Sequence, residues 1–204
     1  MIRLNEIKMP LGTTEQEVKT AAAKVLRIKE SDIKSFSLAR RSIDSRKKSD
    51  IKLIYSVEIE TDLNEENIVA SFPSNKAVLT EKYDYQVPEA KRNFKLRPVI
   101  AGFGPAGMFA ALTLAKAGLN PIVLERGSDV DERTKDVEAF WTKSQLNTKS
   151  NVQFGEGGAG TFSDGKLTTG IKDHRCREVF LRFAEFGAPA EILYSATPHI
   201  GTDK

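Results

Sequence analysis

Three glycines in the middle of the chain have a spacing that suits phosphate chemistry. They form the pattern Gly-x-Gly-x-x-Gly over residues 102–107, in the stretch GFGPAG. In this pattern the first glycine permits a tight turn, the second lets the backbone approach a pyrophosphate, and the third lets a helix pack closely on a strand. The N-terminal amides of that helix would face the phosphates. The sequence therefore predicts a dinucleotide-binding turn, with Gly102, Gly104, Pro105, Ala106 and Gly107 at the cofactor.

An acidic residue completes this pattern about 20 positions after the last glycine. Glu125 follows the apolar run 121–124 and precedes Arg126. A carboxylate at this point can accept hydrogen bonds from the adenosine ribose hydroxyls, and it would repel a 2′-phosphate. We therefore expect Glu125 and Arg126 to lie at a site that disfavours NADP, and the pattern leaves NAD and FAD as alternatives.

A second glycine-rich stretch needs its own explanation. Six glycines fall between positions 154 and 170, in FGEGGAGTFSDGKLTTG. Ordering so many glycines costs conformational entropy, so something must come close to this backbone. The stretch also contains Gly-x-Gly-x-x-Gly, but the later motifs of a kinase do not follow it and Lys166 lacks the spacing of a Walker motif.

The first pattern has the flanking elements that a dinucleotide-binding unit requires. Residues 98–101 and 121–124 are short apolar runs typical of buried parallel strands. Residues 106–116 between them have a strongly helical composition that stops at Gly118. Strand, helix and strand in this order predict two parallel strands joined by a right-handed crossover.

The N-terminal part of the chain has the pattern of a separate α+β domain over residues 1–72. We expect a strand over 4–9, a helix from Thr13 or Thr14 to about residue 28, strands over 33–42 and 51–60, and a short helix over 65–71. This βαββα order is ferredoxin-like. Residues 73–97 contain two prolines and a mixture of charges, so they are interpreted as a linker to a second domain over 98–204.

Several long motifs, in order along the chain, resemble one family. They are RPVIAGFGPAGMFAAL, VLERG, NVQFGEGGAGTFSDGKL and PHIGTDK, and the N-terminal stretch LARRSIDSRKKSDIKLIYSV fits the same family. The chain resembles the N-terminal portion of the bacterial uncharacterised FAD-dependent dehydrogenases, whose FAD domain is glutathione-reductase-like. The resemblance implies an α/β fold, in which an incomplete Rossmann-like FAD-binding unit follows the small α+β domain.

The same resemblance implies an FAD-dependent oxidoreductase that transfers hydride through flavin between NAD(P)H and an unassigned substrate. It further implies that residues 155–166 cover the flavin or its pyrophosphate. The expected contacts are Gly158, Gly160, Thr161, Ser163 and Lys166. Lys166 would stabilise the anionic reduced ring near N1 and C2=O. Because members of this family are longer, we expect these 204 residues to be an N-terminal fragment that binds FAD weakly or not at all.

Composition excludes several other classes of protein. The chain is 40% hydrophobic and 29% charged with a net charge of +3, as in ordinary globular proteins, and neither half is basic enough to indicate nucleic acid. One cysteine and two histidines provide neither a disulfide framework nor a metal site. Signal-peptide and membrane-span patterns are absent from the sequence. We therefore expect a cytoplasmic protein without a membrane partner.

A basic cluster leaves a second hypothesis open. In it, the N-terminal domain binds RNA or a protein, and the Rossmann-like part only senses a nucleotide. The cluster consists of Arg40, Arg41, Arg46, Lys47 and Lys48. Two aspartates interrupt it and its loop has no aromatic residue for base stacking, which favours a solvated hairpin.

Other side chains are interpreted mainly as structural. Cys176 and His174 are expected at the start of a helix, whereas His199 is a candidate for a place near an active site. The helical spacing of Val130, Val137, Phe140 and Trp141 predicts one buried apolar face. No residue is assigned to catalysis.

Overall fold

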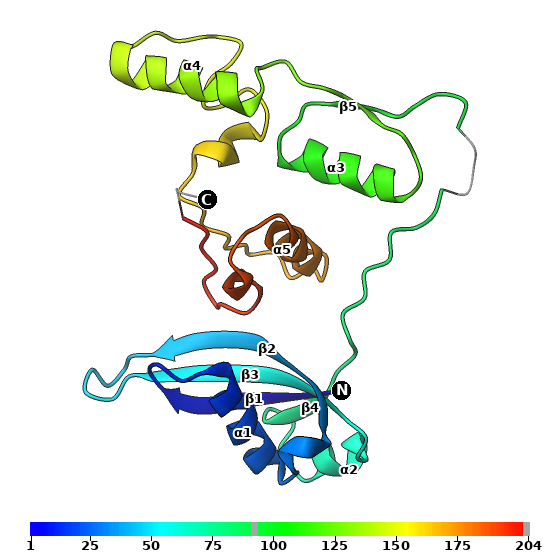
Figure 1. Ribbon diagram of the computed structural model, residues 1–204, viewed down its shortest axis with the longest axis vertical. Helices are drawn as coiled ribbons and strands as arrows, with labels where there is room; N and C mark the ends of the chain where they lie inside the picture. Colours follow the sequence, from blue (N-terminus) through cyan, green and yellow to red (C-terminus); the bar gives the residue numbers. More distant parts are fainter. Residues whose placement is uncertain (91–93, 202–204) are drawn as a thin grey trace. The chain divides into compact units, whose positions relative to one another are not determined.

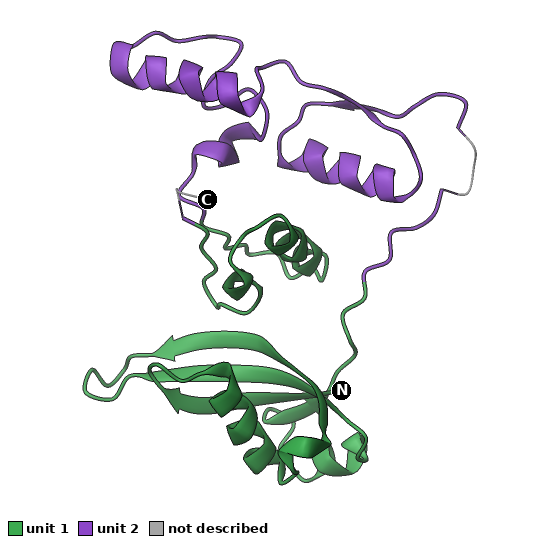
Figure 2. Ribbon diagram, in the orientation of Figure 1, with its two compact units in different colours: residues 1–84, 166–200, 204 green, residues 85–165, 201–203 purple. Residues whose placement is uncertain are grey.

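The computed structural model describes residues 1–90 and 94–201 and has a mixed α/β fold with two sheets (Figure 1). Its elements are β1 (Ile2–Pro10), α1 (Glu15–Leu26), η1 (Glu30–Asp32), β2 (Ile33–Asp44), β3 (Lys52–Thr61), α2 (Glu65–Ala70), β4 (Ala77–Leu79), β5 (Val99–Ala101), α3 (Pro105–Lys116), β6 (Ile122–Leu124), α4 (Val130–Lys143), η2 (Gly158–Phe162), α5 (Cys176–Glu185) and η3 (Ala190–Leu193), where η denotes a 3₁₀ helix. They form two compact units, coloured in Figure 2. Residues 1–84 and 166–200 make one unit, and residues 85–165 make most of the other.

The N-terminal sheet has the strand order β2–β3–β1–β4, and all neighbouring strands are antiparallel. Tyr55, Val57 and Ile59 are buried at alternate positions of β3, as expected for a strand with one face against the core. Both α1 and α2 lie on the same face of this sheet (Figure 1), and they pack against its core. The βαββα order predicted from the sequence is therefore confirmed.

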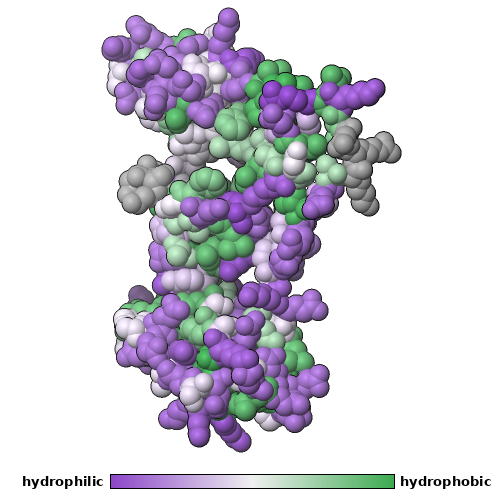
Figure 3. All heavy atoms as spheres, turned by 45° about the vertical axis from the view of Figure 1, so that its right-hand side comes forward, coloured by the Kyte–Doolittle hydropathy of each residue, from purple (hydrophilic) through white to green (hydrophobic). Residues whose placement is uncertain are grey.

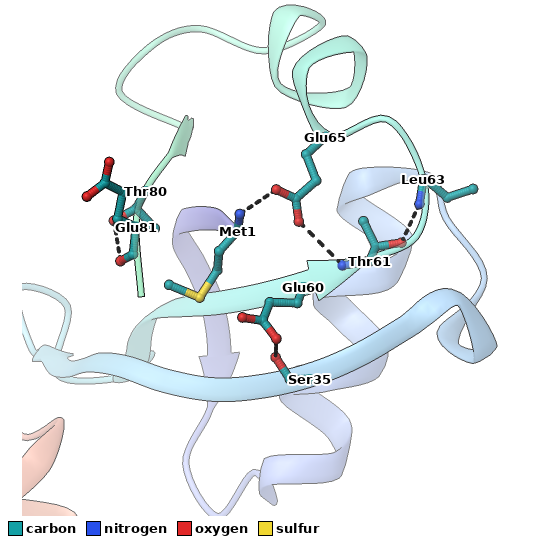
Figure 4. A network of polar contacts seen from close by, with 8 residues as sticks. All are labelled: Met1, Ser35, Glu60, Thr61, Leu63, Glu65, Thr80 and Glu81. Atoms are coloured by element: carbon teal, nitrogen blue, oxygen red, sulfur yellow. Dashed lines mark hydrogen bonds and ion pairs between the residues drawn. The ribbon is translucent and has the colours of Figure 1, made fainter. Parts of the chain in front are cut away.

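Helix α1 begins where its cap requires. The Thr14 hydroxyl accepts a hydrogen bond from the Glu17 amide, and the Glu17 carboxylate accepts one from the Thr14 amide. This reciprocal capping box satisfies amides that have no partner within the helix. A similar local network joins α2 to the sheet (Figure 4), where the N-terminal ammonium group of Met1 pairs with Glu65. The other oxygen of that carboxylate accepts a hydrogen bond from the Thr61 amide at 3.4 Å.

The predicted linker over 73–97 contains a strand that the sequence pattern did not reveal. Strand β4 pairs with the first residues of β1, with Leu4 opposite Ala77 and Ile2 opposite Leu79. Ala77 is fully buried. A three-residue strand is too short to show an alternating pattern, and its partner lies more than 70 residues away in sequence. The small domain therefore extends past residue 72, and its βαββαβ order is that of a split βαβ sheet.

Unit 85–165 contains a strand–helix–strand segment. Strands β5 and β6 are parallel neighbours, with Val99 opposite Ile122 and Ala101 opposite Leu124. Helix α3 connects them and begins at Pro105, one residue before the predicted start. The predicted parallel pair is therefore confirmed. Several apolar side chains of this unit reach the surface (Figure 3). Val99 on β5 is 61% exposed and Leu124 on β6 is 57% exposed, so the prediction that these two strands are buried is wrong.

Two further predictions need correction. In α4, Val137 is buried, but Trp141 is 63% exposed, so the predicted apolar face is not buried as a whole. Arg133, four positions before Val137, is fully buried instead. The sequence assigns residues 166–200 to the second domain, but in the structure they group with residues 1–84, and Ser195 pairs with Arg41 on β2.

No helix within the described ranges combines the length and the apolar character needed to cross a membrane.

Candidate functional site

The chain's own geometry requires two of the glycines in the turn between β5 and α3. Gly102 has φ +95°, a conformation that side chains rarely adopt, and its amide donates to the Leu124 carbonyl at 2.6 Å. A Cβ on Gly107 would lie 2.0 Å from the Gly102 carbonyl oxygen. Both glycines are therefore required to pack the first turn of α3 against the end of β5.

Gly104 is different, because the protein does not require it. Its backbone is extended at φ −76°, which any residue adopts, and it caps α3 without a side chain. A Cβ there would meet its nearest neighbour, the Gly158 Cα, at 3.8 Å, an ordinary contact. A methyl group at Gly104 would therefore cause no clash within the chain, and it would lie at the N-terminus of α3, where the first amides of a helix have no intrahelical acceptor.

Glu125 holds this turn from the end of β6. One carboxylate oxygen accepts a 2.6 Å hydrogen bond from the Phe103 amide, and the other accepts one of 2.9 Å from the Gly127 amide. The Gly127 and Phe103 amides lower the pKa of the Glu125 carboxyl group because they stabilise its charged form. The turn therefore has a fixed negative charge beside it.

The glycine-rich segment packs directly against this turn. The Gly157 amide donates to the Phe103 carbonyl at 2.9 Å. A Cβ on Gly158 would lie 3.2 Å from the Gly104 Cα, and one on Gly127 would lie 2.5 Å from the Gly155 Cα. The close approach that the sequence predicts is therefore one of backbone to backbone where Gly158 meets Gly104 and where Gly127 meets Gly155.

A buried arginine organises the same segment from α4. The Arg133 guanidinium donates to the carbonyl oxygens of Asn151 at 2.9 Å, Val152 at 3.0 Å and Gly158 at 2.7 Å, and also to that of Glu156. A Cβ on Gly155 would lie 2.5 Å from the Arg133 Cδ. Burial lowers the pKa of Arg133, and the charge of Glu125 opposes that shift. Arg133 thus turns the carbonyl groups of the segment toward itself.

The β5–α3 turn, the end of β6 and the glycine-rich segment line an open cavity of about 500 Å³. It is lined by Ala101, Gly102, Gly104, Leu124, Glu125, Arg126, Gln153, Phe154, Gly155 and Gly158. The Arg126 guanidinium lies 3.7 Å from the centre of the Phe154 ring, so a flat cationic group covers an aromatic face at the cavity wall. Five residues selected from the sequence therefore meet here: Gly102, Gly104, Glu125, Arg126 and Gly158.

The other selected residues lie outside the cavity lining. Pro105, Ala106 and Gly107 form the first turn of α3, and Gly160 and Thr161 belong to η2. The Thr161 hydroxyl lies 3.3 Å from both the Arg133 Nη1 and the Glu156 carbonyl oxygen, and the Ser163 hydroxyl accepts from the Gly165 amide at 3.2 Å. Cofactor contacts by Gly160, Thr161 and Ser163 stay predictions.

Lys166 belongs to the compact unit formed by residues 1–84 and 166–200, not to the unit that contains the cavity. It forms an isolated antiparallel bridge with His199. Its contact with flavin therefore stays a prediction, as does a catalytic place for His199. Cys176 is half-buried at the start of α5, where the sequence puts it.

Sequence reasoning missed Arg133, Gln153 and Phe154. Arg133 had one local signal, because it lies one helical turn before Val137 and so shares its buried face. Phe154 and Arg126 pair although they are 28 positions apart in the sequence. No local sequence pattern predicts this contact.

Comparison with known proteins gives two similarities. Residues 1–60 match a family model described as a domain of unknown function (DUF8436). A Clostridium beijerinckii protein named "Uncharacterized protein" is 48% identical over 204 residues. That match covers 99% of this chain and 38% of the relative, so the chain spans well under half the length of the relative it resembles.

Proposed function

We propose that the unit of residues 85–165 binds a dinucleotide, FAD, as part of a Rossmann-like fold. The observation that carries the proposal is the contrast between the glycines of the β5–α3 turn. Gly102 and Gly107 serve the chain's own geometry, whereas Gly104 borders the cavity with space beside it. Space kept free at the N-terminus of a helix suits a diphosphate, which accepts hydrogen bonds from the unpaired amides and is favoured by the helix dipole.

The remaining lining residues fit the other parts of such a ligand. Each Glu125 oxygen accepts an amide hydrogen bond and retains a further lone pair for a ribose hydroxyl. The fixed negative charge would repel a 2′-phosphate. A cavity of about 500 Å³ is within the usual size of small-molecule sites.

FAD, rather than NAD, is proposed on the motifs that resemble the FAD-dependent dehydrogenases. When bound, FAD would supply hydride transfer through its flavin ring. In that function the chain's own residues bind and orient the cofactor: the first amides of α3 hold the diphosphate, and Glu125 holds the ribose. The activity we propose is that of an oxidoreductase with NAD(P)H as the electron donor.

The test compares two substitutions that each add one methyl group. In Gly104→Ala the methyl group enters space that the protein leaves free, so the fold is kept and a diphosphate is obstructed. In Gly170→Ala the methyl group meets nothing within 4 Å. We expect Gly104→Ala to weaken FAD binding by about tenfold or more while Gly170→Ala has no effect, because approach of the backbone to the pyrophosphate is what the second glycine permits. Equal affinity in the two variants, measured by equilibrium dialysis, would contradict the proposal.

A further inference from the structure

Strand β2 forms one edge of the N-terminal sheet. An edge strand presents unpaired amide and carbonyl groups that can accept another strand. In the last third of β2 the edge does so: the Arg41 amide donates to the Tyr194 carbonyl at 2.6 Å, and the Ala196 amide donates to the Arg41 carbonyl at 2.9 Å. This is a parallel bridge between Arg41 and Ser195. A segment from the far end of the chain is thus added to the sheet.

The side chain of Arg41 holds the same segment. Its Nη2 lies 3.0 Å from a Glu191 carboxylate oxygen and 3.3 Å from the Ser195 hydroxyl oxygen. Its guanidinium also lies 5.1 Å from the centre of the Tyr194 ring. The segment is also buried in part, because Ile192, which follows Glu191, is only 2% exposed. Backbone and side chain of one β2 residue therefore bind four residues of the segment 190–199.

The segment continues to the residues that the sequence marked for cofactor chemistry. Beyond Ala196, the Pro198 carbonyl accepts a 3.0 Å hydrogen bond from the Leu167 amide, and His199 bridges Lys166. A cavity of about 480 Å³ lies along this path, with Arg41, Thr197 and His199 in its lining. The edge of β2 thus fixes a segment that in turn pairs with the residues at position 166 and beyond.

We propose that the N-terminal domain acts as an internal docking platform, which captures residues 190–199 of its own chain on the edge of β2, with Arg41 as the positioning residue. The proposal gives the N-terminal domain a role. The family model that matches residues 1–60 is described only as a domain of unknown function. The role does not depend on the dinucleotide proposal, because the contacts given above for it lie within residues 1–84 and 166–200.

The segment 190–199 lies far from Arg41 in the sequence, so a single weak contact would not hold it. Arg41 and Glu191 are 150 positions apart, so the pairing must offset the entropy of closing a long loop. Glu191 is half exposed, and an exposed ion pair alone contributes little. Backbone pairing, the ion pair and the aromatic contact act together at Arg41.

Charge reversal tests the proposal in the full chain. Arg41→Glu and Glu191→Arg each replace attraction with repulsion, and the double variant restores the pair with its signs exchanged. We expect each single variant to speed hydrogen exchange of the Ala196 and Leu167 amides by about fivefold or more, and the double variant to recover most of that protection. Arg40→Glu is the matched control, because Arg40 is the exposed neighbour of Arg41 on β2. Exchange of the β3 amides reports whether the sheet itself stays folded.

A second variant leaves β2 untouched. Ala196→Pro removes the amide that donates to the Arg41 carbonyl. It should expose the Leu167 amide to exchange without changing that of β3. The proposal would be overturned if the Leu167 amide exchanged at the wild-type rate in Ala196→Pro and in both charge-reversed single variants. That is the rate expected for the control variant, Arg40→Glu.

Discussion

The Arg133 guanidinium donates a 2.7 Å hydrogen bond to the carbonyl oxygen of Gly158, while the Gly158 Cα lies against Gly104. One buried side chain of α4 therefore holds the glycine-rich segment at the turn between β5 and α3. This relationship connects the segment's composition to its position, because Gly155 has no room for a side chain beside Arg133.

Replacing Arg133 should destabilise the unit of residues 85–165. In Arg133→Met several backbone carbonyl groups lose their donor at once, which should cost at least about 3 kcal/mol. Lys135→Met is the matched control on the same helix, where an exposed ion pair with Glu132 is lost and the cost should stay within about 0.5 kcal/mol. Urea unfolding followed by Trp141, the one tryptophan in the sequence, measures both. Equal unfolding midpoints would show that Arg133 does not hold the segment.

The glycines of the turn should separate into two classes by stability. Gly107→Ala forces a methyl group to 2.0 Å from the Gly102 carbonyl oxygen, so the helix must shift. We expect a loss above about 2 kcal/mol for Gly107→Ala and a change within about 0.5 kcal/mol for Gly104→Ala. The same urea experiment measures the difference. A Gly104→Ala variant as unstable as Gly107→Ala would mean that both glycines serve packing.

Acid should weaken this unit partly through Glu125. The pKa of its carboxyl group is lowered below the ordinary 4.5 because the Gly127 and Phe103 amides donate to the charged form. A lowered pKa in the folded state contributes stability above the unfolded pKa, and that stability is lost as pH falls through the folded pKa. Glu125→Gln should therefore have a lower unfolding midpoint at about pH 6 and a smaller loss between about pH 5 and about pH 3. Glu138→Gln, an exposed change on α4, should keep the wild-type slope.

The sequence predicts those features of the fold that depend on residues close together in the chain. The β5–α3 turn depends on residues within one strand–turn–helix, so spacing alone predicts the tight turn at Gly102 and the close helix packing at Gly107. The capping of α1 at Thr14 is equally local. Alternation in β3 shows which side chains are buried, because one face of the strand meets the core.

The features that could not be predicted depend on partners far away in sequence. Strand β4 exists because it pairs with residues 2–4, and Arg133 is buried because residues 151–158 fold around it. Lys166 was assigned with the glycine-rich segment, but its bridge to His199 puts it in the other unit. Three-dimensional pairing of this kind leaves no periodic signal.

The most direct test of the central claim is an amide NMR titration of the full chain with FAD and, separately, with FMN, which lacks the adenosine monophosphate half and therefore has no diphosphate. We predict that millimolar FAD shifts the amide signals of Gly104, Ala106 and Gly107 and that of Glu125, and that FMN leaves these signals in place. Unmoved signals with FAD, or equal shifts with FMN, would contradict a dinucleotide site at the N-terminus of α3.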